Sequence, residues 1–203
     1  YLGARGHAVQ YFGMEHADRI VGNRAGAYTS GMDFHGASAA ARLLYSFKTI
    51  YSSEARKKIR QVLDDFQPDV CHLNNFNYQL TPSILLEIRK WEKQTGHACQ
   101  IVYTAHDYQL VCPNHLLFDP QKYQICEKCL GGNYSHCVKN RCIKGSKLMS
   151  ILSKREAEYI RKRKWYDQVD LFICPSEFYR RKLIEGNFTK SLIVTMRNPL
   201  PLD

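Results

Sequence analysis

Residues 99–105 read CQIVYTA, and HDY follows them directly. The run is mostly apolar and does not alternate, as expected of a strand covered on both faces, whereas a half-exposed strand would alternate apolar and polar residues. Three further runs have the same character: DVCHL (69–73), DLFIC (170–174) and SLIVTM (191–196). We therefore predict four buried strands, and we add a short apolar strand at AVQYF (8–12).

Helical patterns separate the buried strands. Apolar residues recur at helical spacing in four segments, 37–66, 80–96, 146–166 and 176–186. Ser146 and Ser176 are the predicted N-caps of the last two, and Pro68 and Gly96 follow the first two. Strands alternating with helices predict an α/β fold, a Rossmann-like, doubly wound and mostly parallel sheet with right-handed connections.

Composition limits the size and class of the protein. The chain has 203 residues and a formal net charge of +10, and 44% of its residues are hydrophobic, which excludes intrinsic disorder. No apolar run reaches the roughly 18 residues of a membrane-spanning helix. Both ends read as interrupted elements, so we expect one Rossmann-like N-terminal domain over 1–203, truncated at both ends, with a cysteine-rich insertion at 108–145.

The insertion holds five of the eight cysteines. Cys126-x2-Cys129 and Cys137-x4-Cys142 offer two close pairs of thiolates, an arrangement suited to a tetrahedral structural zinc, and Cys112 is a substitute ligand. Four protein ligands would leave no open position, so we expect no catalytic metal. Disulfides and unligated thiols stay open as alternatives.

Three cysteines lie in or beside the strand-like runs: Cys71, Cys99 and Cys174. Cysteine in an apolar strand behaves as a small buried hydrophobe. We therefore interpret these three residues as part of the core.

Polar residues follow the predicted strands, and ligands of open parallel sheets bind beyond the carboxyl ends of the strands. The candidates are Asn74, Asn75, His106, Asp107, Tyr108, Ser176 and Glu177. An imidazole beside a carboxylate can donate, accept or hold a charged group, so His106 and Asp107 are the sharpest candidates. Turn formation is the simpler interpretation of the asparagines. Ser176 and Glu177 suit an N-cap and a first helical turn, whose free amides could also face an anionic ligand.

Several function classes lack their signatures. The chain contains no GxGxxG, no Walker A sequence and no GxSxG, which argues against dinucleotide oxidoreductases, P-loop NTPases and α/β-hydrolases. A basic zinc-ribbon module that binds nucleic acid is one alternative, although the cysteines occupy only an insertion. A nucleotide-sugar-binding epimerase or dehydrogenase is another, with its fingerprint before residue 1.

Five stretches in series carry a resemblance to a known family: RGHAVQYF (5–12), QPDVCHLNNF (67–76), IVYTAHDYQLVCPN (101–114), VDLFICPSEFYRRKL (169–183) and RNPLP (197–201). The chain resembles the N-terminal, acceptor-side domain of GT-B glycosyltransferases of the family-4 type. These enzymes retain anomeric configuration, and bacterial members carry a similar cysteine-rich loop after the HDY segment.

The resemblance implies transfer of a sugar from a nucleotide-diphosphate donor to a polysaccharide or glycolipid acceptor, without a catalytic metal. It assigns His106 and Asp107 to the cleft near the donor sugar, and Asn74 and Asn75, with Tyr108, to the acceptor side. The donor domain of such enzymes is absent from the sequence, so we expect the fragment alone to be inactive.

Basic residues concentrate in one predicted helix: Lys154, Arg155, Arg161, Lys162, Arg163 and Lys164. Trp165 and Tyr166 follow them. A solvated helix face is the simplest interpretation, an anionic membrane surface the second, and nucleic acid the least favoured. With no secretion signal, we expect a cytoplasmic protein, peripheral at the inner face of the cell membrane if the second interpretation holds.

Overall fold

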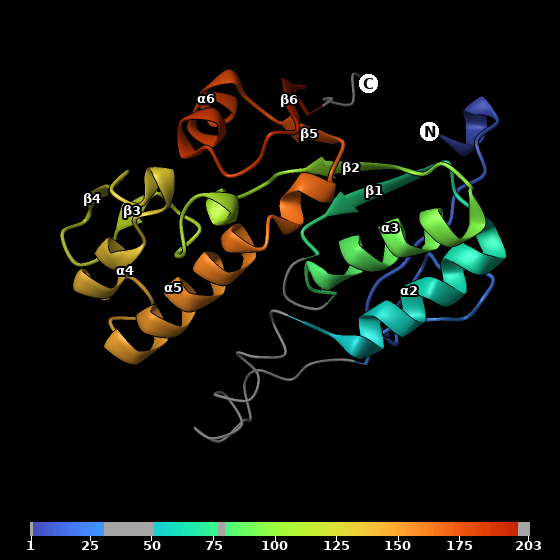
Figure 1. Ribbon diagram of the computed structural model, residues 1–203, viewed down its shortest axis with the longest axis horizontal. Coiled ribbons are helices and arrows are strands. Elements are labelled where there is room, and N and C mark those ends of the chain that lie inside the picture. The colour runs from blue at the N-terminus through green and yellow to red at the C-terminus, as the bar shows by residue number, and fades with distance from the viewer. Residues whose placement is uncertain (1, 31–50, 77–79, 199–203) are drawn as a thin grey trace. The chain divides into compact units, whose positions relative to one another are not determined.

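The computed structural model describes residues 2–30, 51–76 and 80–198. The chain forms two compact units, and each unit is built from two separate segments of the sequence. The first unit comprises Tyr1–Cys71 and Phe76–Cys99, and the second comprises His72–Asn75 and Gln100–Asp203. Figure 1 shows the elements of both units along the chain.

Two helices, α2 (Ser53–Phe66) and α3 (Ser83–Thr95), pack against each other in the first unit. The Ser52 side chain caps α2 by accepting the amide proton of Ala55. Gly96 ends α3 with a left-handed φ of 74°, a conformation in which glycine has no steric cost. The predicted helix over 80–96 is confirmed, and that over 37–66 is confirmed for 53–66, since 37–50 lie outside the described residues.

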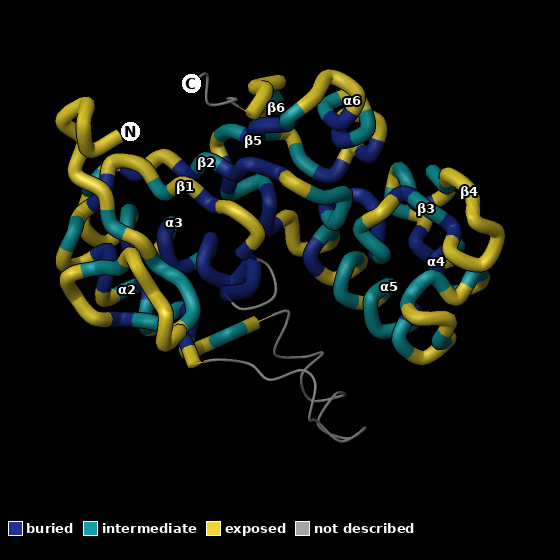
Figure 2. The backbone as a smooth tube through the Cα atoms, turned by 180° about the vertical axis from the view of Figure 1, so that it is seen from behind, coloured by how far each residue is buried: buried dark blue, intermediate teal, exposed yellow. Residues whose placement is uncertain are grey.

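Burial explains why both helices form. Ile59 and Leu63 of α2 are buried, as are Ile84, Ile88 and Trp91 of α3. Each set recurs every three or four residues, so each helix has one apolar face. Figure 2 shows α3 as one of the most deeply buried segments.

Four strands form the main sheet in the order β1–β2–β5–β6: Val70–Asn74, Gln100–Thr104, Leu171–Cys174 and Leu192–Thr195. β5 is parallel to both β2 and β6, with Val102 opposite Leu171 and Phe172 opposite Ile193. Helix α6 (Glu177–Gly186) packs on β5 and β6. The predicted α/β class, the four strands and the helix over 176–186 are confirmed. The burial predicted for all four strands is wrong for β1 and β6, which lie at the edges of the sheet and leave Val70 and Leu192 exposed, whereas β2 and β5 in the middle are largely buried.

The strand predicted at 8–12 is wrong. The only described helical or strand elements near it are a 3-10 turn, η1 (Gly3–Arg5), and a single bridge between Met14 and Thr29. Val9 and Tyr11 are exposed. A strand needs a hydrogen-bonded neighbouring strand, and the Tyr11 amide instead donates to the carbonyl of Gly22 in a local loop.

The insertion has a small structure of its own. Strands β3 (Phe118–Asp119) and β4 (Gln124–Ile125) form an antiparallel pair, and η3 (Leu130–Gly132) and α4 (Ser135–Lys139) follow. Asp119 is fully buried and accepts hydrogen bonds from the amide of Gln121 and the side chain of Asn140. These bonds tie the hairpin to the end of α4.

Helix α5 (Lys147–Lys162) packs on α4, and the Ser146 hydroxyl caps it as predicted. The helix ends four residues before the predicted end at 166, and a 3-10 turn, η4 (Trp165–Gln168), follows. Tyr166 of this turn packs against Phe172 and Phe188 in an aromatic core. None of the helices in the described ranges is long and apolar enough to cross a membrane.

Candidate functional site

The carboxyl ends of β1 and β2 bring two predicted site residues together in the second unit. The His106 Nε2 lies 3.1 Å from the Asn74 Oδ1, and both side chains are exposed. An amide oxygen only accepts, so this bond places the proton of a neutral His106 on Nε2 and leaves Nδ1 as an acceptor. This arrangement suits a ligand hydroxyl that donates a hydrogen bond.

A second pair lies next to the first. His72 Nε2 and Thr104 Oγ1 share a hydrogen bond of 2.7 Å. Partial burial, together with nearby His106, lowers the pKa of His72, which keeps its imidazole neutral at neutral pH. The edge therefore presents two imidazoles, an amide and a hydroxyl, all of them hydrogen-bonding groups.

Asp107 follows His106 in sequence but makes different contacts. Its carboxylate accepts the amide proton of Gln109 at 2.8 Å and so caps the 3-10 turn η2 (Tyr108–Leu110). Its other oxygen lies 3.8 Å from the Nδ1 of His115. Burial lowers the pKa of His115, and the Asp107 charge partly offsets that effect. Asp107 thus shapes the loop after β2.

Tyr108 and Asn75 complete the predicted acceptor side. The Tyr108 ring meets the ring of Tyr179 edge to face, with centroids 4.6 Å apart. Burial raises the pKa of the Tyr108 phenol, as does Glu127. Asn75 is exposed and has a left-handed φ of 40°, which fits the turn that was its simpler interpretation.

Ser176 and Glu177 have structural partners. The Ser176 hydroxyl accepts the amide proton of Tyr179 and caps α6, so the capping interpretation is confirmed. Glu177 accepts a hydrogen bond from the Thr195 hydroxyl at 2.8 Å and pairs with Arg180 at 3.0 Å. The Thr195 bond and then the Arg180 bond lower the pKa of Glu177.

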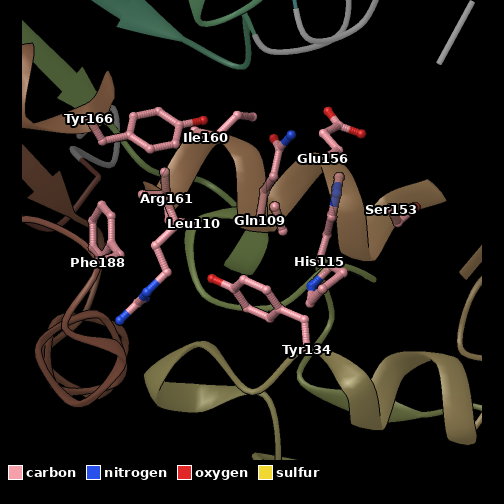
Figure 3. Close-up of a pocket in the computed structure, with 12 residues that line it drawn as sticks. Gln109, Leu110, His115, Tyr134, Ser153, Glu156, Ile160, Arg161, Tyr166 and Phe188 are labelled. Atoms are coloured by element: carbon pink, nitrogen blue, oxygen red, sulfur yellow. The ribbon is translucent and has the colours of Figure 1, made fainter. Parts of the chain in front are cut away.

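A small pocket lies behind the loop after β2 (Figure 3). It encloses about 40 Å³, which is room for a few ordered waters but not for a sugar ring. His115 of the loop, Tyr134, and Glu156 and Arg161 of α5 line it. Burial alone raises the pKa of Glu156 to about 7. Arg161 donates to the carbonyl groups of residues 186 and 187, so its role here is structural.

The cysteines of the insertion form pairs. The Cys112 thiol donates a hydrogen bond to the Asn114 side chain at 2.9 Å. Cys129 lies near Cys112, and Cys142 near Cys137, so that each neighbour affects the pKa of the other. The nearby Cys129 thiol, with the amides of the following loop, lowers the pKa of Cys112, although burial opposes the shift. Across the described ranges, no group of three or more His, Cys, Asp or Glu side chains is arranged to hold a metal ion.

The basic segment divides by exposure. Arg155, Lys162, Arg163 and Lys164 are exposed. Trp165 and Tyr166, by contrast, are buried. The aromatic side chains are therefore unavailable to a membrane, and a surface role would rest on the four basic side chains.

The sequence did not single out His72, Thr104 or Glu156. His72 stands two residues before Asn74, and residues two apart in a strand share a face. This spacing could have identified His72 as a neighbour of Asn74 in the candidate site. Thr104 was hidden within an apolar run. Glu156 lies on a helix whose charged residues suggested a solvated face, and only packing shows that its carboxyl group is buried.

Comparison with known proteins gives one family and one relative. A family model described as Glycosyltransferase Family 4 matches residues 1–203. A Klebsiella pneumoniae protein named "Uncharacterized 42.6 kDa protein in cps region" is 24% identical over 78 residues, 38% of this chain. The match spans 19% of that relative's length. No solved structure shows a significant match.

Proposed function

The chain belongs to glycosyltransferase family 4, and from this we propose that it forms the acceptor-binding half of a retaining glycosyltransferase with the GT-B fold. The proposed reaction moves a sugar from a nucleotide-diphosphate donor to a polysaccharide or glycolipid acceptor. The family match over the whole chain supports the enzyme class. The polar groups at the ends of β1 and β2 support the position of the site, since ligands of parallel sheets bind there.

The Asn74–His106 pair carries the proposal at the level of residues. Asn74 holds the Nε2 proton of His106, which leaves Nδ1 to accept a hydrogen bond from a sugar hydroxyl. Asp107 acts as a positioning residue, because its carboxylate fixes the turn that follows His106. Asn75 and Tyr108 flank this edge on the acceptor side.

The test uses the complete gene product that contains this chain. Release of nucleoside diphosphate is measured with a panel of UDP-, GDP- and dTDP-sugars, with and without glycan or glycolipid acceptors. We expect release with at least one donor, and retained anomeric configuration of the product by NMR. Absence of release with every donor would contradict the proposed activity, and an inverted product would contradict retention.

Substitution of His106 tests the site separately. We expect His106→Ala to lower kcat/KM by about 100-fold, a typical effect of removing a positioned imidazole. Asn74→Ala should have a smaller effect in the same direction, because it releases the ring without removing it. His16→Ala, at an exposed histidine of the first unit, is the matched control and should keep full activity. Equal activity of all three variants would exclude His106 from the site.

The isolated chain tests whether acceptor binding and sugar transfer belong to different parts of the enzyme. We propose that residues 1–203 bind acceptor without turnover, and that turnover requires a separate donor-binding half. Sugar transfer by the isolated chain would contradict this.

A structural zinc in the insertion is also a proposal. Cys112 lies against Cys129, and a charge on Cys112 raises the pKa of Cys137 and of Cys142. Cys126 directly follows the β3–β4 hairpin, where its amide donates to the Leu117 carbonyl. The thiols therefore favour Cys112 over Cys126 as the fourth ligand, although the present arrangement of the side chains is not that of a metal site.

A further inference from the structure

Two cysteines outside the insertion lie in contact. The Sγ atoms of Cys71 and Cys99 are 3.5 Å apart. Cys99 is completely buried, whereas Cys71 is half-buried and retains some contact with solvent. The sequence had placed both in the core as small hydrophobes, and nothing in it indicated that they meet across 28 residues of chain.

Both backbone groups of Cys99 are hydrogen-bonded to side chains of α3. Arg89 of α3 donates a hydrogen bond from its guanidinium group to the Cys99 carbonyl at 3.0 Å. Glu92, one turn later, accepts the Cys99 amide proton at 3.1 Å. The hydrogen bond with Cys99 and burial raise the pKa of the Cys71 thiol, and the positive charge of nearby Arg89 opposes that shift. The bond with Cys71 lowers the pKa of Cys99.

Cys71 and Cys99 lie at the two points where the chain passes from the first unit to the second. Cys71 is the last residue of the first unit before the chain passes to His72, and Cys99 is the last before it passes to Gln100. A covalent bond between the two would therefore join both of these crossing points. His72 and Asn74 of the candidate site begin directly after Cys71.

We propose that Cys71 and Cys99 are an oxidisable dithiol that hydrogen peroxide converts to a disulfide. The Sγ atoms need to approach from contact to a bond of about 2.05 Å, which side-chain rotation can supply at this separation. Peroxide is small enough to reach the half-buried Cys71.

The chemistry is a two-electron oxidation in two steps. Cys71 first loses its proton, and its thiolate then attacks one oxygen of the peroxide. The O–O bond breaks, and sulfenic acid and hydroxide form. The Cys99 thiol then loses its proton and attacks the Cys71 sulfur. The S–O bond breaks, the S–S bond forms, and water leaves. Peroxide is reduced to water overall, and the two thiols are oxidised to one disulfide.

Peptide mapping tests the proposal directly. The protein is treated with peroxide, free thiols are alkylated, and the digest is made with trypsin without reduction. Cleavage after Arg60 and Arg89 and after Lys93 and Lys122 gives peptides 61–89 and 94–122. We expect these two peptides to be linked, and fragmentation must place the bond on Cys99, because Cys112 is in the same peptide.

The disulfide should also be visible in stability. Closing this loop is expected to raise Tm by about 10 °C, and a reducing agent should reverse the shift. Cys71→Ser should abolish both the linked peptide and the peroxide-dependent shift. Cys174→Ser, at a buried cysteine of β5, is the matched control and should keep both.

Two results would overturn the proposal. One is full alkylation of Cys71 and Cys99 after peroxide treatment. The other is oxidation of Cys71 to sulfinic acid without a linked peptide. Both are measured in the wild-type protein, so the conclusion does not depend on whether a variant folds.

Discussion

Replacing Glu156 by glutamine should stabilise the protein at high pH and leave it unchanged at low pH. The carboxyl group lines the small pocket on α5, and burial alone raises its pKa from 4.5 to about 7. Ionising it in the folded protein therefore costs free energy that the unfolded chain does not incur. Glutamine has nearly the same shape and no charge.

Proton linkage determines the sign and size of the change in the free energy of unfolding. Between pH 4.5 and 7 the folded protein binds more protons at Glu156 than the unfolded chain does, so the wild-type free energy of unfolding falls as the pH rises. Raising the pKa of Glu156 from 4.5 to about 7 corresponds to about 3 kcal/mol at full extent. We expect Glu156→Gln to raise the free energy of unfolding by up to about 3 kcal/mol at pH 8 and to have no effect at pH 4.

Urea denaturation at both pH values measures this difference. His115, Tyr134, Arg161 and Tyr166 also line the pocket, but they are present in both proteins, so their titration largely cancels. Glu158→Gln, on the same helix but exposed, should change stability by less than about 0.5 kcal/mol. An equal effect of Glu156→Gln at both pH values would refute burial as the cause.

Three further perturbations test the packing, the insertion and the surface. Gly186→Ala should destabilise the protein by about 1–2 kcal/mol, because its Cβ would lie 2.2 Å from a Val111 methyl group. Adding Val111→Ala to the same chain should cancel part of this loss of stability. If urea denaturation shows that the effects of the two substitutions simply add, the steric explanation is wrong. Metal analysis should find zinc in Cys126→Ser but not in Cys112→Ser, and equal zinc contents would exclude Cys112 as a ligand. The protein should sediment with anionic vesicles through the exposed basic side chains in and after α5, and added salt should release the protein from the vesicles. If the protein does not sediment with the vesicles, or if salt does not release it, the basic segment is not a membrane-binding face.

The candidate site was only partly readable from the sequence. The rule that ligands bind beyond strand ends identified Asn74 and His106, and the structure places them in contact. Asp107 is adjacent to His106 in the chain, yet its carboxylate caps a turn and faces His115. Neighbours in sequence can point to different partners once the loop turns, and sequence does not specify which way the loop turns.

The sequence by itself determined the α/β class, the four strands of the sheet and the caps of α5 and α6. These features depend on local spacing, since the strands of a parallel sheet are mostly apolar and an N-cap needs a side-chain acceptor at one position. The tertiary structure decided which side chains meet: Cys71 with Cys99, Cys112 with Cys129, and Glu156 with its pocket. Each of these contacts joins residues distant in sequence or depends on burial, and a local pattern carries no information about either.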